Sequence, residues 1–449
     1  MSLTPTAEEN SPSLPFDVLC SVAAALASEP AWESKFTTLS ALSRCCSSLR
    51  AVCQQHIFHT INLCPRICDS SRRPSRPDND YHVPSILFRE LERILEHNLG
   101  IARYIRALHY NSHPSNFTGN RVSRLLDKLG ELESLRVTFF VDISEFGEVE
   151  DYGTEDENYD INPISVNWQS FPSNLQNSLI GLINLQSFRR LDMEHVINFP
   201  VYLLKFSRLQ MLHLAHCRIL IPSALSHSSS EERAPTQLRS LYLAPGARVN
   251  ADVLRTALDF SSIRVLEFEF VYQGDEEQVG ELLDSTPQIT SLALRIGRRC
   301  PDINVVSSVL AAHDRVCRDL LQHLCLSSKL EPRELPKSNN FLLFNMLKDV
   351  PSWDVLETIS ITLEEVPQFS DYYVKDLEKL DKHLSNKSIF PALRKVSISI
   401  ELVINYAIDD FNPDDGPWSK LPEMHLLNLA HSSIDVDYSV GDFPGYSDY

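Results

Sequence analysis

The stretch Leu209-Gln-Met-Leu212-His-Leu214 is the clearest copy of a short pattern that recurs along most of this chain. In each copy an apolar residue is followed by two more, three and five positions later. The alternation that ends the pattern is typical of a strand whose alternate side chains point to one face. Here the pattern continues through Cys217 to Ile219. Other copies begin at Ile105, Leu132, Phe188, Leu238, Ile263, Ile289, Leu321, Leu356, Leu393 and Met424, and a weaker one, interrupted by Pro163, begins at Ile161.

The spacing of the copies carries more weight than their number, because three fixed apolar positions also match by chance. The central residues of successive copies lie about 20 to 40 residues apart, a period that is typical of stacked repeat units. Several intervals contain apolar residues at helical spacing, for example residues 121–129, 250–258, 276–283, 303–310 and 372–384. An alternation of strand and helix predicts parallel strands, because each helix returns the chain to the start of the next strand.

From about residue 100 to residue 434 this arrangement resembles leucine-rich repeat proteins. The resemblance implies an α/β solenoid with parallel strands on the concave face and helices on the convex face. The repeat lengths are uneven, so we expect an irregular solenoid over residues 61–434. Period 2 along each strand places the residues between the apolar ones on the concave face, where a target protein would bind. The candidate target-binding residues are Arg136, Arg190, Asp192, Glu194, His213, Tyr242, Glu267, Glu269 and Arg295.

A helical pattern precedes the repeats. Pro is favoured in the first turn of a helix, where its missing N–H costs no hydrogen bond, and here it stands at the start of the pattern. The residues Phe58-His-Thr-Ile61-Asn-Leu63 then repeat the strand pattern directly after the helices. The first helical face contains Leu14, Pro15, Val18, Leu19, Val22 and Leu26, and a second stretch of about 18 residues contains Leu39, Leu42 and Leu49.

Residues 14–60 resemble an F-box, through the Leu14-Pro15 opening, the second apolar stretch and the strand that follows. The whole chain resembles the F-box proteins of higher fungi, in which such a module precedes irregular leucine-rich repeats. The resemblance implies that the module binds a Skp-type adaptor of a cullin ubiquitin ligase. By this resemblance the first six apolar residues would belong to the adaptor-facing or core part, and Leu39, Leu42 and Leu49 would form the second helical stripe. All nine are candidate adaptor-binding residues. This copy lacks the tryptophan that is often found in the second stretch.

Composition excludes several classes of function. The chain has 449 residues and a net charge of −19, which disfavours nucleic acid as a ligand because phosphate would be repelled. No apolar run is long enough to span a membrane, and the polar start does not resemble a secretory signal, so residues 1–13 are expected to be a disordered leader. The ten cysteines show no paired spacing, which favours a reduced, intracellular protein in the cytoplasm, the nucleus or both.

No pattern of catalytic residues is visible. The chain contains neither a glycine-rich phosphate loop nor a nucleophile elbow, so we expect no enzyme, no cofactor and no metal site. Residues 142–160 are dense in Asp and Glu without Lys or Arg, and we interpret them as a disordered insert in the solenoid. Residues 435–449 are interpreted as a disordered acidic tail.

Two hypotheses of function follow. In the first, the chain is the substrate-recognition subunit of an SCF-type cullin ubiquitin ligase: the module binds a Skp-type adaptor and the solenoid binds a target protein. In the second, it is a repeat scaffold whose N-terminal helices only cap the open end of the solenoid, as terminal repeats must.

Overall fold

The fold is described from a computed structural model. The leader at residues 1–13, the pair Leu14 and Pro15, and the acidic insert at 142–160 all lie outside the described residues. The structure describes residues 16–28, 32–45, 47–63, 84–112, 120–139, 165–219, 235–244, 247, 249, 251–272, 274–297, 300, 304–313, 318–329, 342–348, 352–366, 371–403 and 425–443.

Three helices form a small module at the N-terminal end of the described chain. They are α1 (Phe16–Ala27), α2 (Trp32–Cys45) and α3 (Ser47–Phe58), and they enclose a core of their own. The stretch that the sequence suggests as one amphipathic segment is therefore divided between α2 and α3. Helix α3 leads directly into strand β1 (Thr60–Leu63), which joins the module to the rest of the molecule.

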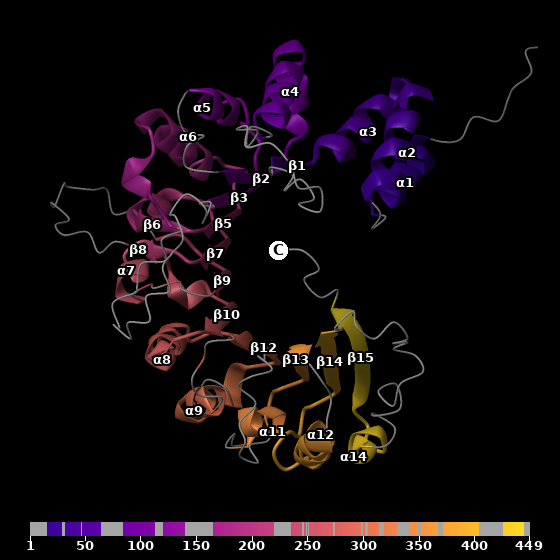
Figure 1. Cartoon of the computed structure of the whole chain (residues 1–449), viewed down its shortest axis with the longest axis vertical. Helices are drawn as coiled ribbons and strands as arrows, with labels where there is room; N and C mark the ends of the chain where they lie inside the picture. The colour runs from indigo at the N-terminus through magenta and orange to yellow at the C-terminus, as the bar shows by residue number, and fades with distance from the viewer. Residues whose placement is uncertain are drawn as a thin grey trace, which may run out of the picture.

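The remainder of the chain is built on one parallel sheet, in which each strand pairs with the next strand of the same sheet along the sequence. Its strands form an arc, and the helices cover the outer side of that arc (Figure 1). The 12-stranded sheet consists of β1, β2 (Ala107–Ser112), β3 (Ser134–Phe139), β5 (Arg190–Glu194), β7 (Met211–Ala215), β9 (Ser240–Leu243), β10 (Val265–Phe270), β11 (Ser291–Ile296), β12 (His323–Lys329), β13 (Thr358–Val366), β14 (Lys395–Val403) and β15 (Asp435–Phe443).

The strands are in register through their central apolar residues. Each central residue pairs with the central residue of the next strand, so one apolar line runs across the whole sheet. Strands are thus confirmed for every copy of the pattern from Ile105 to Leu393, except the weak copy at Ile161. The line consists of Ile61, Leu108, Leu135, Leu191, Leu212, Leu241, Leu266, Leu292, Leu324, Ile359, Val396 and Val436.

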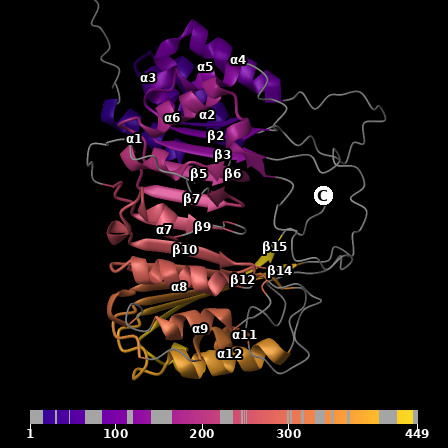
Figure 2. The same cartoon turned by 90° about the vertical axis from the view of Figure 1, so that its left-hand side faces the viewer.

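The outer side of the sheet carries helices that complete a single continuous apolar core from Leu63 to Ile434. Figure 2 shows the strands stacked one above another, with α7, α8 and α9 in front of them. This α/β arrangement is compatible with the predicted solenoid. The helices are α4 (Pro84–His97), α5 (Arg121–Leu126), α6 (Ser173–Ile183), α7 (Ala251–Arg255), α8 (Asp275–Ser285), α9 (Val305–Ala312), α11 (Leu342–Leu347), α12 (Asp371–Leu384) and α14 (Leu427–Ala430).

The weak copy at Ile161 supplies no strand to the main sheet, because β3 pairs directly with β5. The chain between them instead forms β4 (Val166–Asn167) and then helix α6. Strand β4 pairs with β6 (Val196–Phe199), and β6 pairs with β8 (Arg218–Ile219), which makes a second, 3-stranded sheet. The prediction of one strand per interval is corrected here, because an interval can hold a helix and a strand of another sheet.

The C-terminal end also differs from the prediction. The copy at Met424 does not form a strand: its central residue, Leu427, begins helix α14. The buried carboxylate of Asp381 accepts hydrogen bonds from the backbone N–H groups of Asn428 and Leu429 in this helix, at 3.0 and 2.8 Å. The last strand, β15, begins at Asp435, where we expected a disordered tail. Tyr438 and Val436 alternate with polar residues and pack against the main core, so the acidic composition hides a strand.

Candidate functional site

The inner, concave side of the arc is the face of the sheet that the helices leave uncovered (Figure 1). Along each strand, side chains alternate between the core and this face. Three rows of residues cross it, and the first, at the start of the strands, includes Arg190, Met211, Ser240 and Val265. The middle row contains Asn62, His109, Arg136, Asp192, His213, Tyr242, Glu267, Ala293, Cys325, Ser360, Ser397 and Asp437. The end row, two residues further along, includes Asn111, Thr138, Glu194, Ala215, Glu269, Arg295, Ser327, Thr362, Ser399 and Ser439.

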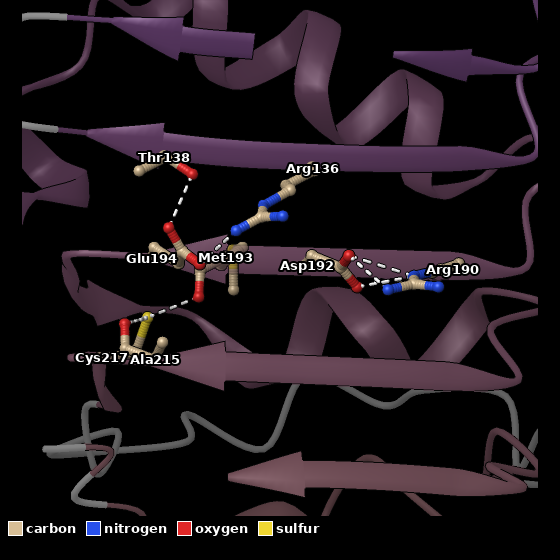
Figure 3. Close-up of polar contacts among 8 residues, drawn as sticks. All are labelled: Arg136, Thr138, Arg190, Asp192, Met193, Glu194, Ala215 and Cys217. Carbon is tan, nitrogen blue, oxygen red and sulfur yellow. Dashed lines mark hydrogen bonds and ion pairs between the residues drawn. The ribbon is translucent and has the colours of Figure 1, made fainter. Parts of the chain in front are cut away.

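A closed polar network connects strands β3 and β5 on this face. Arg136 donates to Glu194 over 2.8 Å between Nη2 and Oε1, and the Thr138 hydroxyl donates to the other carboxylate oxygen, also over 2.8 Å (Figure 3). Burial by itself would raise the pKa of Glu194, but the Thr138 hydrogen bond and the Arg136 charge outweigh it and lower that pKa. The carboxylate is therefore held ionised by its own neighbours.

A second ion pair lies beside it within β5. The Asp192 side chain is only 5% exposed, and both its oxygens accept from Arg190 Nε, at 2.9 and 3.0 Å, while Nη2 lies 2.8 Å from Oδ2. The hydrogen bond to Asp192 raises the pKa of Arg190. Burial lowers the pKa of the adjacent His109, with further lowering from Arg136. The charges in this part of the face are already compensated within the molecule.

An aromatic contact follows on the next two strands. The rings of His213 and Tyr242 have centroids 4.0 Å apart and are tilted by 47°. Burial lowers the pKa of His213 to about 4, although Asp192 and Glu194 act in the opposite direction. His213 is thus neutral near pH 7, and its buried Nε2 has no hydrogen-bond partner among the described residues.

The next carboxylates, on β10, differ in their surroundings. Glu269 lies with Oε2 at 3.8 Å from Arg295 Nη1, and Arg295 also donates from Nε to the Ser327 hydroxyl at 3.0 Å. For Glu267, no hydrogen bond or ion pair is made within the described part of the chain. Burial raises the pKa of Glu267, and the more distant charge of Arg295 only partly opposes that effect. Glu267 is therefore a half-buried carboxylate without a close counter-ion.

The C-terminal part of the face is lined by small polar residues. In the middle row these are Ser360 and Ser397, and in the end row the Ser439 hydroxyl donates to that of Ser399 over 3.1 Å in an exposed position. All the concave-face residues that the sequence suggests lie on this face. In some of them the charge is balanced by an ion pair with a neighbouring side chain, and in Glu267 it is not, within the described residues. Sequence reasoning missed Thr138 and Ser327 as partners of the charged residues, because only the register brings them there.

A pair of histidines next to the concave strands was also missed. His195 and His216 each follow a strand directly, have positive φ angles of 60° and 49°, and stack with centroids 4.6 Å apart. The next residue after His216, Cys217, donates its buried thiol to the carbonyl oxygens of Met193 and Ala215 (Figure 3). The sequence signal was a histidine at the same position of two successive copies.

The N-terminal module presents apolar side chains to solvent. Phe16 is 50% exposed, Val18 43% and Val22 44% on α1, and Phe36 on α2 is 44% exposed. Val18 and Val22 are four residues apart and therefore share one face of α1, whereas Phe16, two residues before Val18, lies on another side of the helix. The pair makes this face of α1 a candidate interaction surface.

The remaining predicted adaptor-binding residues are less exposed. Leu19, Leu26 and Leu42 are half-buried and pack against the module's own core. Leu39 and Leu49 are 0% and 2% exposed within that core. Leu39 and Leu49 therefore belong to the core that holds the three helices together, whereas Val18 and Val22 lie on the surface of the module.

Within the described residues, no group of three or more His, Cys, Asp or Glu side chains is placed to hold a metal ion. The described helices are also all too short or too polar to cross a membrane. Neither the models of known protein families nor the curated proteins contain a match to this chain.

Proposed function

We propose that this chain is the substrate-recognition subunit of an SCF-type cullin ubiquitin ligase, in which the α1–α3 module binds a Skp-type adaptor and the arc binds a target protein. The arc would be an irregular leucine-rich repeat solenoid. The protein would act inside the cell, in the cytoplasm, the nucleus or both, and would bring a target to the ligase without catalysing a reaction itself.

The observation that carries this proposal is the pair of exposed apolar side chains, Val18 and Val22, on one face of α1. The module has its own core, so the exposure of Phe16, Val18 and Val22 is not needed to hold the helices together. Each such side chain left in water forgoes about 1 to 2 kcal/mol of hydrophobic stabilisation that a partner would recover. An exposed apolar face on a small module at one end of the arc favours a protein with two binding surfaces, one on the module for the Skp-type adaptor and one on the arc for the target.

The alternative is a repeat scaffold whose module is only a cap. It has a specific observation in its favour: the aromatic ring of Phe58, at the end of α3, packs against the arc's core together with Ile61 of β1. Covering the end of the sheet requires contacts of this kind, but it gives no reason for the exposed apolar face on α1. Both roles are compatible if α3 caps the arc while α1 meets the adaptor.

The test is co-purification of the full chain with the Skp-type adaptor from cells, with wild type and the double variant Val18→Ser, Val22→Ser. We expect the adaptor to be retained by wild type and lost by the double variant, with an unchanged unfolding temperature. The matched control is Leu427→Ser, which removes a 49% exposed apolar side chain at the opposite end of the arc and should leave adaptor binding intact. Absence of the adaptor from the wild-type preparation would reject the proposal in favour of the scaffold.

A further inference from the structure

Tyr242 and Glu267 are neighbours on the concave face. They occupy paired positions on strands β9 and β10, and the row continues to His213 on one side and to Ala293 on the other. The His213 ring lies against Tyr242 and so holds the phenol ring from one side. On the other side, the paired position on β11 holds Ala293, whose side chain is a single methyl group.

Glu267 differs from the other carboxylates of this face. Glu194 is paired with Arg136, Asp192 with Arg190, and Glu269 faces Arg295. In the described part of the molecule, Glu267 forms no ion pair and no hydrogen bond. The nearest strand that carries a cation on this face is β11, and its Arg295 is engaged with Glu269 and Ser327.

The rim of this position is apolar. Val265 lies two residues before Glu267 on the same side of the strand and is 37% exposed, and Met211 lies two residues before His213 and is 41% exposed. Ser240 stands between them in the register. The surface therefore combines the apolar side chain of Val265, the aromatic ring of Tyr242 and the carboxylate of Glu267 side by side.

We infer that Tyr242 and Glu267 form an acceptor for a lysine or arginine side chain of the protein that the arc binds. The cation would lie between the carboxylate and the face of the phenol ring, and its methylene chain would cover Val265. A Lys or Arg side chain combines an apolar stem with a charged end, and both contacts are favourable where the surface is partly dry.

Electrostatics favour a cation over a neutral group at this position. Burial raises the pKa of Glu267, which means that the ionised carboxylate lacks compensation in the free protein. The net charge of the chain is −19, so the long-range field also attracts basic segments. A neutral hydrogen-bond donor would use the same oxygens but would leave the charge uncompensated.

This inference deepens the proposed function, since it rests on the assignment of a protein target to the concave face. It does not depend on the adaptor, because the residues lie on β9 and β10 and not in the α1–α3 module. A purified full-length chain is therefore sufficient to test it, and failure of adaptor binding leaves this test unaffected.

The experiment uses immobilised peptides of equal length with mixed flanking residues and a fixed central Lys, Arg, Gln or Glu, probed with the labelled full chain. We expect peptides with Lys or Arg to bind wild type roughly tenfold better than those with Gln, as close charge pairs at interfaces do. Glu267→Gln should abolish this preference, and Tyr242→Leu should reduce it. The control Glu281→Gln makes the same charge change at an exposed position of helix α8 and should retain it.

Three outcomes would overturn the inference. The first is equal binding of the Lys, Arg and Gln peptides by wild type, which includes binding of none of them above background. The second is a preference for basic peptides that persists in Glu267→Gln. The third is loss of the preference in the Glu281 control to the same extent, which would attribute the effect to net charge. The unfolding midpoint of Glu267→Gln, expected at or above that of wild type, checks that the variant folds.

Discussion

Glu194 and Glu267 lie on the same concave face, both half-buried, yet their surroundings are opposite. Glu194 accepts from Arg136 and Thr138, and its pKa is lowered by those contacts in spite of burial. Glu267 has no such partner in the described chain, and burial raises its pKa. A carboxylate that is satisfied within the molecule stabilises the fold, whereas one that is not satisfied costs stability and gains most from a ligand.

The same contrast extends to the strands around these residues. Strands β3 and β5 carry charges that are already paired, so a partner would have to compete with existing hydrogen bonds there. Strands β9 and β10 carry an aromatic ring and an unpaired charge. We therefore expect substitutions around Glu194 to change mainly stability, and substitutions around Glu267 to change mainly binding.

The largest effect should follow from Glu194→Ala. The substitution removes the acceptor of two hydrogen bonds, one of them within an ion pair, and leaves Thr138 and Arg136 without that partner. We expect the free energy of unfolding to fall by about 1 to 3 kcal/mol in urea titrations near pH 7. Glu194→Gln keeps one oxygen acceptor and should lose less. A change no larger than that of Glu281→Ala on the outer helix α8 would contradict the stabilising role of the network.

The contribution of Glu194 to stability should also depend on pH. Its pKa in the folded chain lies below the ordinary value of 4.5, so the carboxylate stabilises the fold fully above pH 4.5. This contribution is lost as the pH falls through the lower, folded pKa. The difference in unfolding free energy between wild type and Glu194→Gln should therefore be constant from pH 7 to about pH 5 and shrink below it. A difference that grows on acidification would show that the sign of the pKa shift is wrong.

Much of this fold follows from the spacing of the apolar pattern. Parallel strands with one central apolar residue each align in only one register if those residues are to share a core, and period 2 then fixes the rows of the concave face. Arg136, Tyr242 and Glu267 could thus be assigned to that face from the sequence.

The partners on that face could not be assigned in the same way. The weak copy at Ile161 suggests a strand between β3 and β5, which would place those two strands about 9.5 Å apart, across two strand spacings, and would separate Arg136 from Glu194. In the structure β3 and β5 are adjacent, and the two side chains meet. Strand β15 was missed for a similar reason. Its apolar residues Val436 and Tyr438 alternate with acidic ones, and only their packing against the main core identifies them as part of a strand.

A smaller effect, of the opposite sign, is expected from Glu267→Gln. The amide has nearly the same shape as the carboxylate but is neutral, so the substitution removes a charge without a counter-ion. The free energy of unfolding near pH 7 should therefore rise by about 0.5 kcal/mol. The folded pKa of Glu267 lies above 4.5, so the cost of its ionisation is present above that folded pKa and disappears as the pH falls toward 4.5. The gain over wild type should vanish in the same range. Destabilisation by the substitution near pH 7 would indicate that Glu267 is satisfied in the folded chain.

The smallest effect should come from the C-terminal part of the face, where small hydroxyl groups replace the charged rows. Ser399→Ala removes the acceptor of the exposed Ser439 hydrogen bond, and water can take its place. We expect the free energy of unfolding to change by less than about 0.5 kcal/mol, and the preference for basic peptides to be unchanged. Urea titration and the same peptide experiment check both. A loss of peptide binding in Ser399→Ala would move the binding surface away from Glu267 toward β14, because this substitution alters no charge and no packing of the core.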